Sequence, residues 1–378
     1  MLEKKIKHFV LVVAIVVAAF GVSLNWIAPV NGQQAQGQAT QAQANAEETM
    51  EQKYKNIQAL KGLPASQMRA MMNYISASTG MTCGECHVKN GDQWAFEKDD
   101  NNHKVIARRM ITMTMDINKA SFNGRTQVTC YTCHQGHDHP SHVPPLVAPK
   151  AAEAPAAAPA PKADEILAKY VQAIGGKEAI EKVKTRVIKG VSVAANGQSF
   201  PLEINFGGTD KYTLSVALPQ GATTQKFNGS AGWLKNSRED RAMDASDIIR
   251  AKSLAWSLEP AQLKEPFMRL GSAGSEKVGD KDCWVLQGRL PDGRRVRFSF
   301  DKTSGLLLRR VVQIVTVIGI DPEQTDYDDY RDIDGVKVPH SITTSYLDRN
   351  YNSTRKFTEV KHNAKVDEVL FNLPTAKQ

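Results

Sequence analysis

The hydrophobic pattern of the chain changes its period about halfway along. Over residues 47–142 the apolar positions recur every three to four residues, as in amphipathic helices. Over residues 164–378 apolar and polar residues mostly alternate, which is typical of strands with one buried face. We therefore predict an α + β multidomain protein, with a mostly helical part followed by an antiparallel β-sheet part.

Two long helices are predicted in the first part. One begins at Pro64–Ser66 and runs to about Ser78, where Thr79-Gly80 ends it. The second is expected over about 102–119. The first helix carries one apolar face, made of Met68, Met71, Met72 and Ile75. The second carries one apolar stripe, made of Ile106, Met110, Met113 and Ile117, with Met115 outside it. Such stripes are typical of core-facing positions, because methionine fills irregular gaps well.

The second part is predicted to be a large antiparallel sheet with one or two helices. A short helix is expected over 164–174 and a helical insertion over about 245–258. The strands are expected at 186–194, 202–206, 212–218, 283–290, 296–300, 306–317, 336–346 and 356–360. Asn-Gly or Asp-Gly pairs at 196, 228, 292 and 334 mark turns between strands.

The amino terminus is predicted to be an export signal. Lys4, Lys5 and Lys7 precede an apolar run over residues 9–24. This run is intermediate in length between a cleaved signal peptide and a minimal spanning helix, so residues 1–32 are either a signal peptide or a membrane anchor. The lysines would stay cytoplasmic. We therefore expect the protein in the periplasm, either free or tethered to the inner membrane.

Two segments poor in core-forming residues delimit the domains. Residues 33–46 form a Gln/Ala-rich stretch, predicted to be a solvated tether. Residues 143–163 hold six prolines and predict an extended spacer of about 60 Å. The predicted domains are therefore 47–142 and 164–378.

Composition narrows the class of protein. The chain has 378 residues, 23% of them charged and 41% hydrophobic, which excludes wholesale disorder, a collagen and a multi-span membrane protein. The net charge of +8 is spread thinly along the chain, without a long basic run. A diffuse excess of this kind is typical of a solvated surface, so we expect no nucleic-acid binding.

The pattern Cys-x-x-Cys-His occurs twice, at 83–87 and 130–134. It is the attachment pattern of c-type haem, in which two thiols form thioethers with the haem vinyl groups and the adjoining histidine ligates the iron. The predicted attachment residues are Cys83, Cys86, Cys130 and Cys133, and the predicted proximal iron ligands are His87 and His134. Two covalently bound haem c groups are expected.

Zinc binding and disulfides are the alternatives for these cysteines. Pairs of cysteines that share a structural zinc are usually about 15–20 residues apart. Here Cys130 follows Cys86 by 44 residues, which favours haem. The fifth cysteine, Cys283, lies in a predicted strand and is expected to be a buried structural thiol.

Residues about 55–146 resemble the photosynthetic reaction-centre cytochrome c subunit family. The resemblance rests on Met72-Asn73-Tyr74-Ile75, on Arg109-Met110-Ile111-Thr112-Met113-Thr114 and on Val128-Thr129-Cys130-Tyr131-Thr132-Cys133-His134. In that family each haem lies parallel to a helix that donates an axial methionine. By position, the resemblance implies Met72 and Met110 as distal iron ligands, with Met71 and Met113 as the respective alternatives.

The chain departs from that family in two ways. Reaction-centre members bind four haems and are often lipid-anchored through an amino-terminal cysteine, whereas this chain has two attachment motifs and no such cysteine. A respiratory and a photosynthetic electron-transport chain therefore both remain open. His137, His139 and His142 are expected to be solvated, while Lys104, Arg108 and Arg109 are candidate partners of haem propionates.

Residues 164–378 resemble the periplasmic lipoprotein-carrier (LolA/LolB-like) superfamily. The resemblance rests on the strand order, on residues 330–339 (YRDIDGVKVP) and on residues 279–286 (GDKDCWVL). The resemblance implies a half-barrel of antiparallel strands around helices. It also implies lipids or lipoproteins as candidate ligands of this domain. Asp326, Asp328 and Asp329 alternate with tyrosines and are expected on the exposed face of a strand rather than in a cation site.

The function expected from these features is that of an exported dihaem c-type cytochrome, an electron carrier rather than an enzyme. Its expected partners are redox proteins of the periplasm or inner membrane. One alternative is a peroxidase-like dihaem enzyme with an open sixth coordination site. Another is a lipid- or lipoprotein-binding protein with a redox-active haem unit.

Overall fold

The computed structural model describes residues 48–141 and 160–374, apart from 209, 238, 245–246, 249–250, 253–268 and 291–292. All described elements belong to one compact unit, Thr49–Gln378. The predicted signal or anchor, the tether, most of the 143–163 spacer and most of the 245–258 helix lie outside the described residues. No helix within the described part of the chain is both long and apolar enough to cross a bilayer.

The first part is helical, with one small hairpin. Its elements are α3 (Met50–Lys53), η1 (Ala65–Gln67), α4 (Met68–Thr79), α5 (Cys83–Cys86), β1 (Val88–Asn90), β2 (Gln93–Ala95), α6 (Asn102–Phe122) and α7 (Cys130–His134). Both predicted long helices are confirmed, and α6 continues three residues beyond its expected end. The β1–β2 hairpin was not predicted from the helical pattern.

The ends of the two long helices follow from their local sequence. α4 ends at Gly80, whose φ of 71° is left-handed and suits a residue without a side chain. α6 begins after Asn101, whose side chain accepts a hydrogen bond from the His103 amide at 2.9 Å. It ends at Asn123, also left-handed. These caps hold the helices that precede the two Cys-x-x-Cys-His segments.

The core of the helical part is small and includes a residue from the sheet. Met50, Leu60, Met71, Tyr74 and Ile111 form one buried cluster. Ile318, at the turn between two long strands, is fully buried in the same cluster. Contact between the helical part and the sheet is therefore made through apolar side chains.

The second part is one sheet with short helices. The helices are α8 (Ala163–Ala173) and α9 (Lys177–Glu181), with 3-10 turns η3 (Arg349–Tyr351) and η4 (Glu368–Phe371). The strands are β3 (Thr185–Ala194), β4 (Ser199–Gly207), β5 (Lys211–Val216), β6 (Thr223–Asn228), β7 (Gly232–Lys235), β8 (Asp240–Ala242), β9 (Arg269–Val278), β10 (Lys281–Arg289), β11 (Arg295–Asp301), β12 (Leu307–Thr316), β13 (Gly319–Ile333), β14 (Val336–Ser345) and β15 (Ser353–His362).

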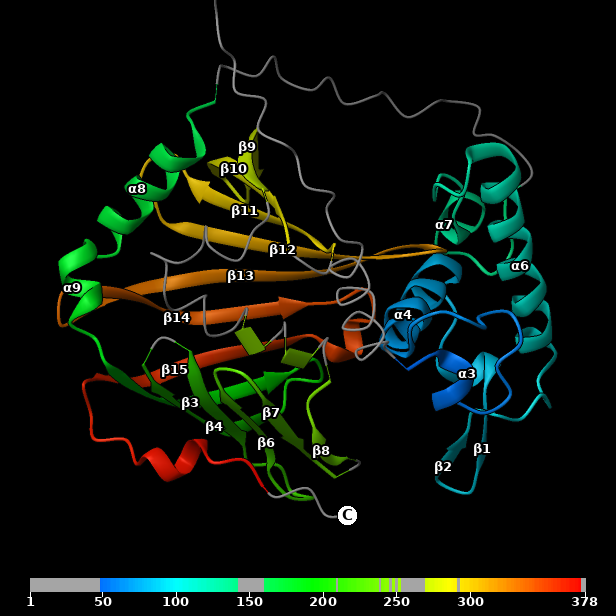
Figure 1. Ribbon diagram of the computed structural model, residues 1–378, viewed down its shortest axis with the longest axis horizontal. Coiled ribbons are helices and arrows are strands. Elements are labelled where there is room, and N and C mark those ends of the chain that lie inside the picture. Colours follow the sequence, from blue (N-terminus) through cyan, green and yellow to red (C-terminus); the bar gives the residue numbers. More distant parts are fainter. Residues whose placement is uncertain are drawn as a thin grey trace, which may run out of the picture. The chain divides into compact units, whose positions relative to one another are not determined.

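These strands form a single open, curved antiparallel sheet (Figure 1). Its order is β8-β7-β6-β5-β4-β3-β15-β14-β13-β12-β11-β10-β9. It thus consists of two meanders, β3 to β8 and β9 to β15, joined where β3 pairs with β15. The predicted fold class is confirmed.

Four strands, β6 to β9, were missed from the sequence, and β13 was anticipated only around residues 326–330. β6 to β8 are short and β9 has few apolar residues. None of these strands therefore shows a clear alternation of apolar and polar residues. β13 is the longest strand but contains Pro322 and several acidic residues, which weaken a strand prediction. Hydrogen bonding to β12 on one side and to β14 on the other holds these residues in a strand despite that weak local preference.

The core of the β part lies on the inner face of the sheet beneath α8. Ile166 and Tyr170 of α8 are buried in this cluster, and the Tyr170 ring lies 5.2 Å from that of Phe300. The same face carries Leu214, Phe227, Val312 and Phe357. Burial of these side chains stabilises the curved sheet against its helix.

Candidate haem-attachment sites

Each Cys-x-x-Cys-His segment forms one helical turn that is capped in the same way. The Thr82 amide donates to the Glu85 carboxylate at 2.6 Å, and the Thr129 amide donates to the Thr132 hydroxyl at 3.0 Å. In each segment the residue before the first cysteine is therefore tied to the residue before the second. This arrangement fixes the turn on which the two thiols lie.

The four motif cysteines are free thiols in partly accessible positions. Cys83 and Cys133 are exposed, whereas Cys86 and Cys130 are half-buried. Residues three apart on a helix share a face, so each pair presents its thiols to one side. Burial raises the pKa of the Cys130 thiol to about 11.

His87 lies against an aromatic ring next to basic residues. Its imidazole contacts Phe96 edge-to-face, with ring centroids 5.0 Å apart. Burial, followed by the charges of Lys104 and Arg108, lowers the His87 pKa and favours the neutral ring. Neutral imidazole is the form that ligates a metal. The His87 Nδ1 atom is buried and has no hydrogen-bond partner in the described part of the chain.

His134 is oriented by the chain that follows it. Its Nδ1 atom lies 2.9 Å from the carbonyl oxygen of His137. Gln135 and Gly136 both have positive φ, which turns the chain back so that this carbonyl reaches the ring. A hydrogen bond at Nδ1 leaves Nε2 as the coordinating atom. His137 and His139 are exposed as expected, and His142 lies outside the described residues.

The residues of both segments fit the attachment of haem c. Two thiols on one helical turn and one imidazole with an available ring nitrogen are the donors that this cofactor requires. Within the described ranges, no three His, Cys, Asp or Glu side chains gather in a metal-binding cluster.

On α4 the two candidate methionines differ in burial. Met71 is fully buried in the core beside Tyr74. Met72 is only half-buried at the edge of the same cluster. A thioether enclosed by core side chains has no room for a ligand, whereas a half-buried one can face a cofactor. This difference favours Met72.

On α6 the methionine stripe does not face the core. Met110 and Met113 are 37% and 45% exposed, while the buried positions are Ile111, Thr114 and Asn118. Core packing, the more ordinary of the two interpretations that the sequence allows for this stripe, is therefore wrong for Met110 and Met113. The core of the helical part is small, and α6 contributes Ile111 to it from the face next to the methionine stripe. Met113 lines an open groove of about 640 Å³.

Two of the candidate propionate partners already have a carboxylate partner. Lys104 and Arg108 each lie 2.9 Å from Asp99. Hydrogen bonds from Arg108, Asn56 and Lys104 hold the pKa of that exposed carboxyl well below its usual range. Arg109 is exposed and lines the groove beside Met113.

Three residues position the second motif, a role that was not predicted for any of them from the sequence. The Tyr74 hydroxyl donates to Thr129 Oγ1 at 2.9 Å. The Asn118 amide donates to the Val128 carbonyl at 2.7 Å, and its oxygen accepts from two amides of the same loop. Gly80 packs directly on the backbone of Gly136. A polar residue at a buried helical position, such as Asn118, is the signal that indicates such a role.

The other residues singled out in the β part have structural roles. Cys283 is fully buried, and burial raises its pKa to about 11. Asp326 pairs with Arg309 at 2.5 Å across β12 and β13. Asp329 pairs with Arg331 at 2.6 Å, and Asp328 is exposed. The prediction of an exposed position is therefore confirmed for Asp328 and Asp329, whereas Asp326 is half-buried.

Comparison of sequences confirms the predicted resemblance of the first part. Residues 23–172 match the family described as "Photosynthetic reaction centre cytochrome C subunit". The chain is 37% identical over 106 residues to the photosynthetic reaction center cytochrome c subunit of Roseobacter denitrificans, and 31% identical over 111 residues to that of Rubrivivax gelatinosus. These matches cover 26% and 28% of this chain. They span 28% of the length of each relative.

Comparison with solved structures finds matches over about half of this chain. A putative outer membrane lipoprotein-sorting protein domain from Vibrio parahaemolyticus covers 56% of this chain and 94% of its own, with 13% identity and a TM-score of 0.41. A LolA superfamily protein from Nitrosomonas europaea covers 56% of this chain and 98% of its own, with 14% identity and a TM-score of 0.39.

Proposed function

We propose that this chain is an exported dihaem c-type cytochrome that carries electrons between redox proteins of the periplasm or inner membrane. The observation that carries the proposal is the doubled motif. Two one-turn helices are capped alike, and each presents two free thiols and a histidine. The match of residues 23–172 to a cytochrome c family supports the same chemistry.

Each attachment segment would bind one haem c through its own cysteines and histidine. Cys83, Cys86 and His87 would hold the first group. Cys130, Cys133 and His134 would hold the second. Bound haem iron supplies one-electron transfer between its ferric and ferrous states. The neutral imidazole of His87 and the Nδ1 contact of His134 prepare both rings for ligation.

Methionines would complete the iron coordination. Met72 is supported by its half-buried position beside the enclosed Met71. Met110 is supported by its exposure on the face of α6 that the protein core leaves uncovered. Capping of both irons by thioethers favours a carrier with a raised reduction potential over an enzyme with an open iron.

The test is a count of covalently bound haem per chain. The purified full-length protein is denatured and stripped of non-covalent cofactor, and its haem is then quantified by the pyridine haemochrome spectrum. We expect two haems per chain, and one after Cys83→Ala with Cys86→Ala. Cys283→Ala is the matched control and should retain two. A colourless denatured chain would exclude the proposed function.

A second measurement separates the carrier from the dihaem enzyme. A carrier with both irons capped should not bind carbon monoxide in the reduced state and should turn over peroxide slowly. Rapid peroxide turnover, or carbon monoxide binding at one haem, would instead support the peroxidase-like alternative.

A further inference from the structure

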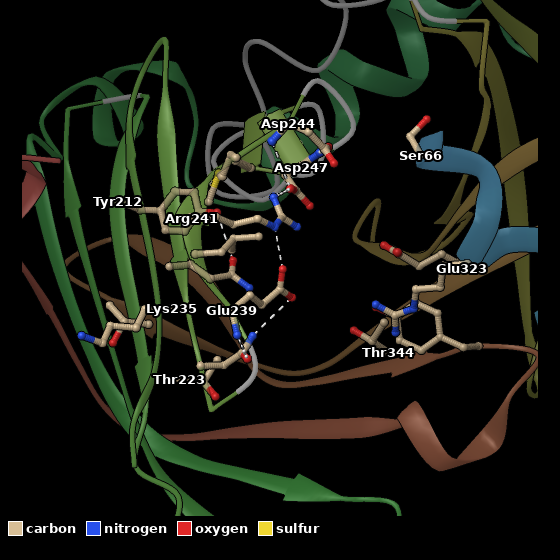
Figure 2. A pocket seen from close by; sticks show the side chains of 18 of the residues that line it. Ser66, Tyr212, Thr223, Lys235, Glu239, Arg241, Asp244, Asp247, Glu323 and Thr344 are labelled. Atoms are coloured by element: carbon tan, nitrogen blue, oxygen red, sulfur yellow. Dashed lines mark hydrogen bonds and ion pairs between the residues drawn. The ribbon is translucent and has the colours of Figure 1, made fainter. Parts of the chain in front are cut away.

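A cavity of about 520 Å³ opens on the inner face of the curved sheet (Figure 2). Strands from both meanders line it, together with residues of the helical part that include Lys53, Ser66 and Arg69. In Figure 2, Tyr212 and Arg241 lie on one side of the cavity, and Glu323 and Thr344 lie on the other. The cavity is separate from both Cys-x-x-Cys-His segments, none of whose residues line it.

The inner face changes from apolar to polar where the cavity begins. Residues two apart on a strand share a face. On β6 the buried Phe227 is followed towards the cavity by Gln225, and on β12 Val312 is followed by Arg310. On β15 the buried Phe357 is followed by Arg355. Leu234, Met243 and Ile342 also line the cavity, but the same change on three strands makes its lining mainly polar, which favours a polar occupant.

An alkyl chain would be a poor occupant of this cavity. Burying methylene groups is favourable only where they replace water at apolar surface. Here they would also displace water from arginine, glutamate and hydroxyl groups, which is costly unless those groups keep their hydrogen bonds. The lining therefore favours a ligand that forms hydrogen bonds itself.

The charges in the cavity are partly neutralised by the protein. Arg241 lies 2.6 Å from Glu239 and 2.8 Å from Asp247. The Arg310 guanidinium lies 3.6 Å from Glu323. Among the other cations that line the cavity, Lys235 pairs with Asp240, whereas Arg355, Lys53 and Arg69 form no ion pair within the described residues.

Arg355 of β15 is one of the cations that line the cavity. It is half-buried, and its side chain makes no ion pair or hydrogen bond within the described part of the chain. Burial raises the pKa of Tyr212 and of Tyr327, and the charge of Arg355 opposes that effect on both. Arg355 therefore acts on tyrosines from both meanders. A half-buried guanidinium at this place is suited to bind an anionic oxygen group.

We propose that this cavity binds a small hydrophilic anion, a carboxylate or phosphate ester that carries hydroxyl groups, with Arg355 as its counter-charge. The hydroxyls of Thr223, Thr325 and Thr344 and the amide of Gln225 line the same space and are suited to the hydroxyl groups of the ligand. This site adds a ligand-binding role that does not involve the residues predicted to attach haem.

The test is isothermal titration of the purified full-length protein with four probes at low salt. Glycerol 3-phosphate represents the phosphate ester and gluconate the carboxylate. Glycerol lacks the charge, and 1-decanol represents an alkyl ligand. We expect at least one of the two anions to bind, and glycerol and decanol to bind at least tenfold more weakly. Arg355→Gln should weaken anion binding about tenfold or more.

The matched control is Arg349→Gln, an exposed arginine in the connection between β14 and β15 that does not line the cavity. It should bind the anion as the unmodified protein does. An unchanged thermal unfolding midpoint of Arg355→Gln verifies that the variant is folded. Failure of both anions to bind, equal affinity after Arg355→Gln, or tighter binding of decanol would each overturn the proposal.

Discussion

The hydroxyl group of Tyr74 donates a hydrogen bond to Thr129 Oγ1 at 2.9 Å, which connects α4 to the residue that caps the second attachment helix. Tyr74 belongs to the buried core, so this bond is largely shielded from water. One core residue thereby fixes the position of the second Cys-x-x-Cys-His segment relative to the helix that carries Met72.

Tyr74→Phe is expected to lower the free energy of unfolding by about 1 kcal/mol. The change removes the hydroxyl and leaves the ring packing intact, so its cost is that of one net hydrogen bond. Urea unfolding measures it. Tyr351→Phe is the matched control, because that ring is exposed and its hydroxyl makes no hydrogen bond within the described residues. Equal losses in the two variants would contradict the role of the Tyr74 bond.

Gly80→Ala is expected to destabilise the protein more than Gly62→Ala does. Both glycines have left-handed φ, 71° and 76°, so an alanine costs about 1–2 kcal/mol at either position. A Cβ on Gly80 would also lie 2.4 Å from the Gly136 carbonyl oxygen, while a Cβ on Gly62 would meet nothing within 4 Å.

The difference between these two alanine variants isolates the contact of α4 with the second motif. We expect Gly80→Ala to lose at least about 1 kcal/mol more, because backbone atoms must move apart. Urea unfolding of both variants gives the comparison. Similar losses would mean that the clash is relieved without cost, and that the Gly80–Gly136 contact does not hold the motif.

The helices could be predicted, and the attachment residues proposed, because their signals are local. Gly80 and Asn101 mark helix ends by backbone conformation and capping, and the Cys-x-x-Cys-His spacing is itself a local requirement of the chemistry. The alternating strands β3, β10 and β14 were predicted for the same reason.

Features that depend on distant contacts could not be predicted. β13 contains Pro322 and acidic residues and is a strand because β12 and β14 pair with it. The stripe with Met110 looked like a core face, yet the core is filled by Ile111 from the adjacent face. The cavity around Arg355 combines strands from both meanders, which no local pattern reveals.

Met72→Ala and Met71→Ala are expected to have opposite effects. Met72→Ala should remove one axial ligand, lower the midpoint potential of the first haem and allow carbon monoxide to bind, with little change in stability. Met71→Ala should leave the spectrum unchanged and lower the free energy of unfolding by about 2–5 kcal/mol, because Met71 is fully buried. Redox titration and urea unfolding decide between them. A lost methionine–iron band in Met71→Ala would reverse the assignment.

Met110→Ala and Met113→Ala form the corresponding pair on α6. Both side chains are exposed, so neither change should cost more than about 0.5 kcal/mol of stability in the haem-free chain. We expect only Met110→Ala to lower the potential of the second haem or to open it to carbon monoxide. If the spectrum and potential of Met110→Ala are unchanged and those of Met113→Ala shift, Met113 is the ligand.

His362 is expected to make stability depend on pH below about 6.5. Its side chain is buried on β15, opposite Arg186 of β3, and burial followed by the Arg186 charge lowers its pKa to about 4. The Asp334 carboxylate, 3.9 Å away, acts in the opposite direction. The unfolded chain binds a proton near pH 6.5, whereas the folded protein does so only near pH 4. The free energy of unfolding should therefore fall as the pH falls from 6.5 to about 4.

The expected loss attributable to His362 is at most about 3 kcal/mol, complete once the pH is below the folded-state pKa. Urea unfolding at several pH values between 7 and 4 measures the profile of the unmodified protein. The His362→Gln side chain cannot titrate. In that variant the decrease in the free energy of unfolding caused by His362 should disappear, while the decrease caused by protonation of the carboxylates should remain. Parallel profiles for the two proteins would show that His362 binds its proton equally well in the folded and unfolded states.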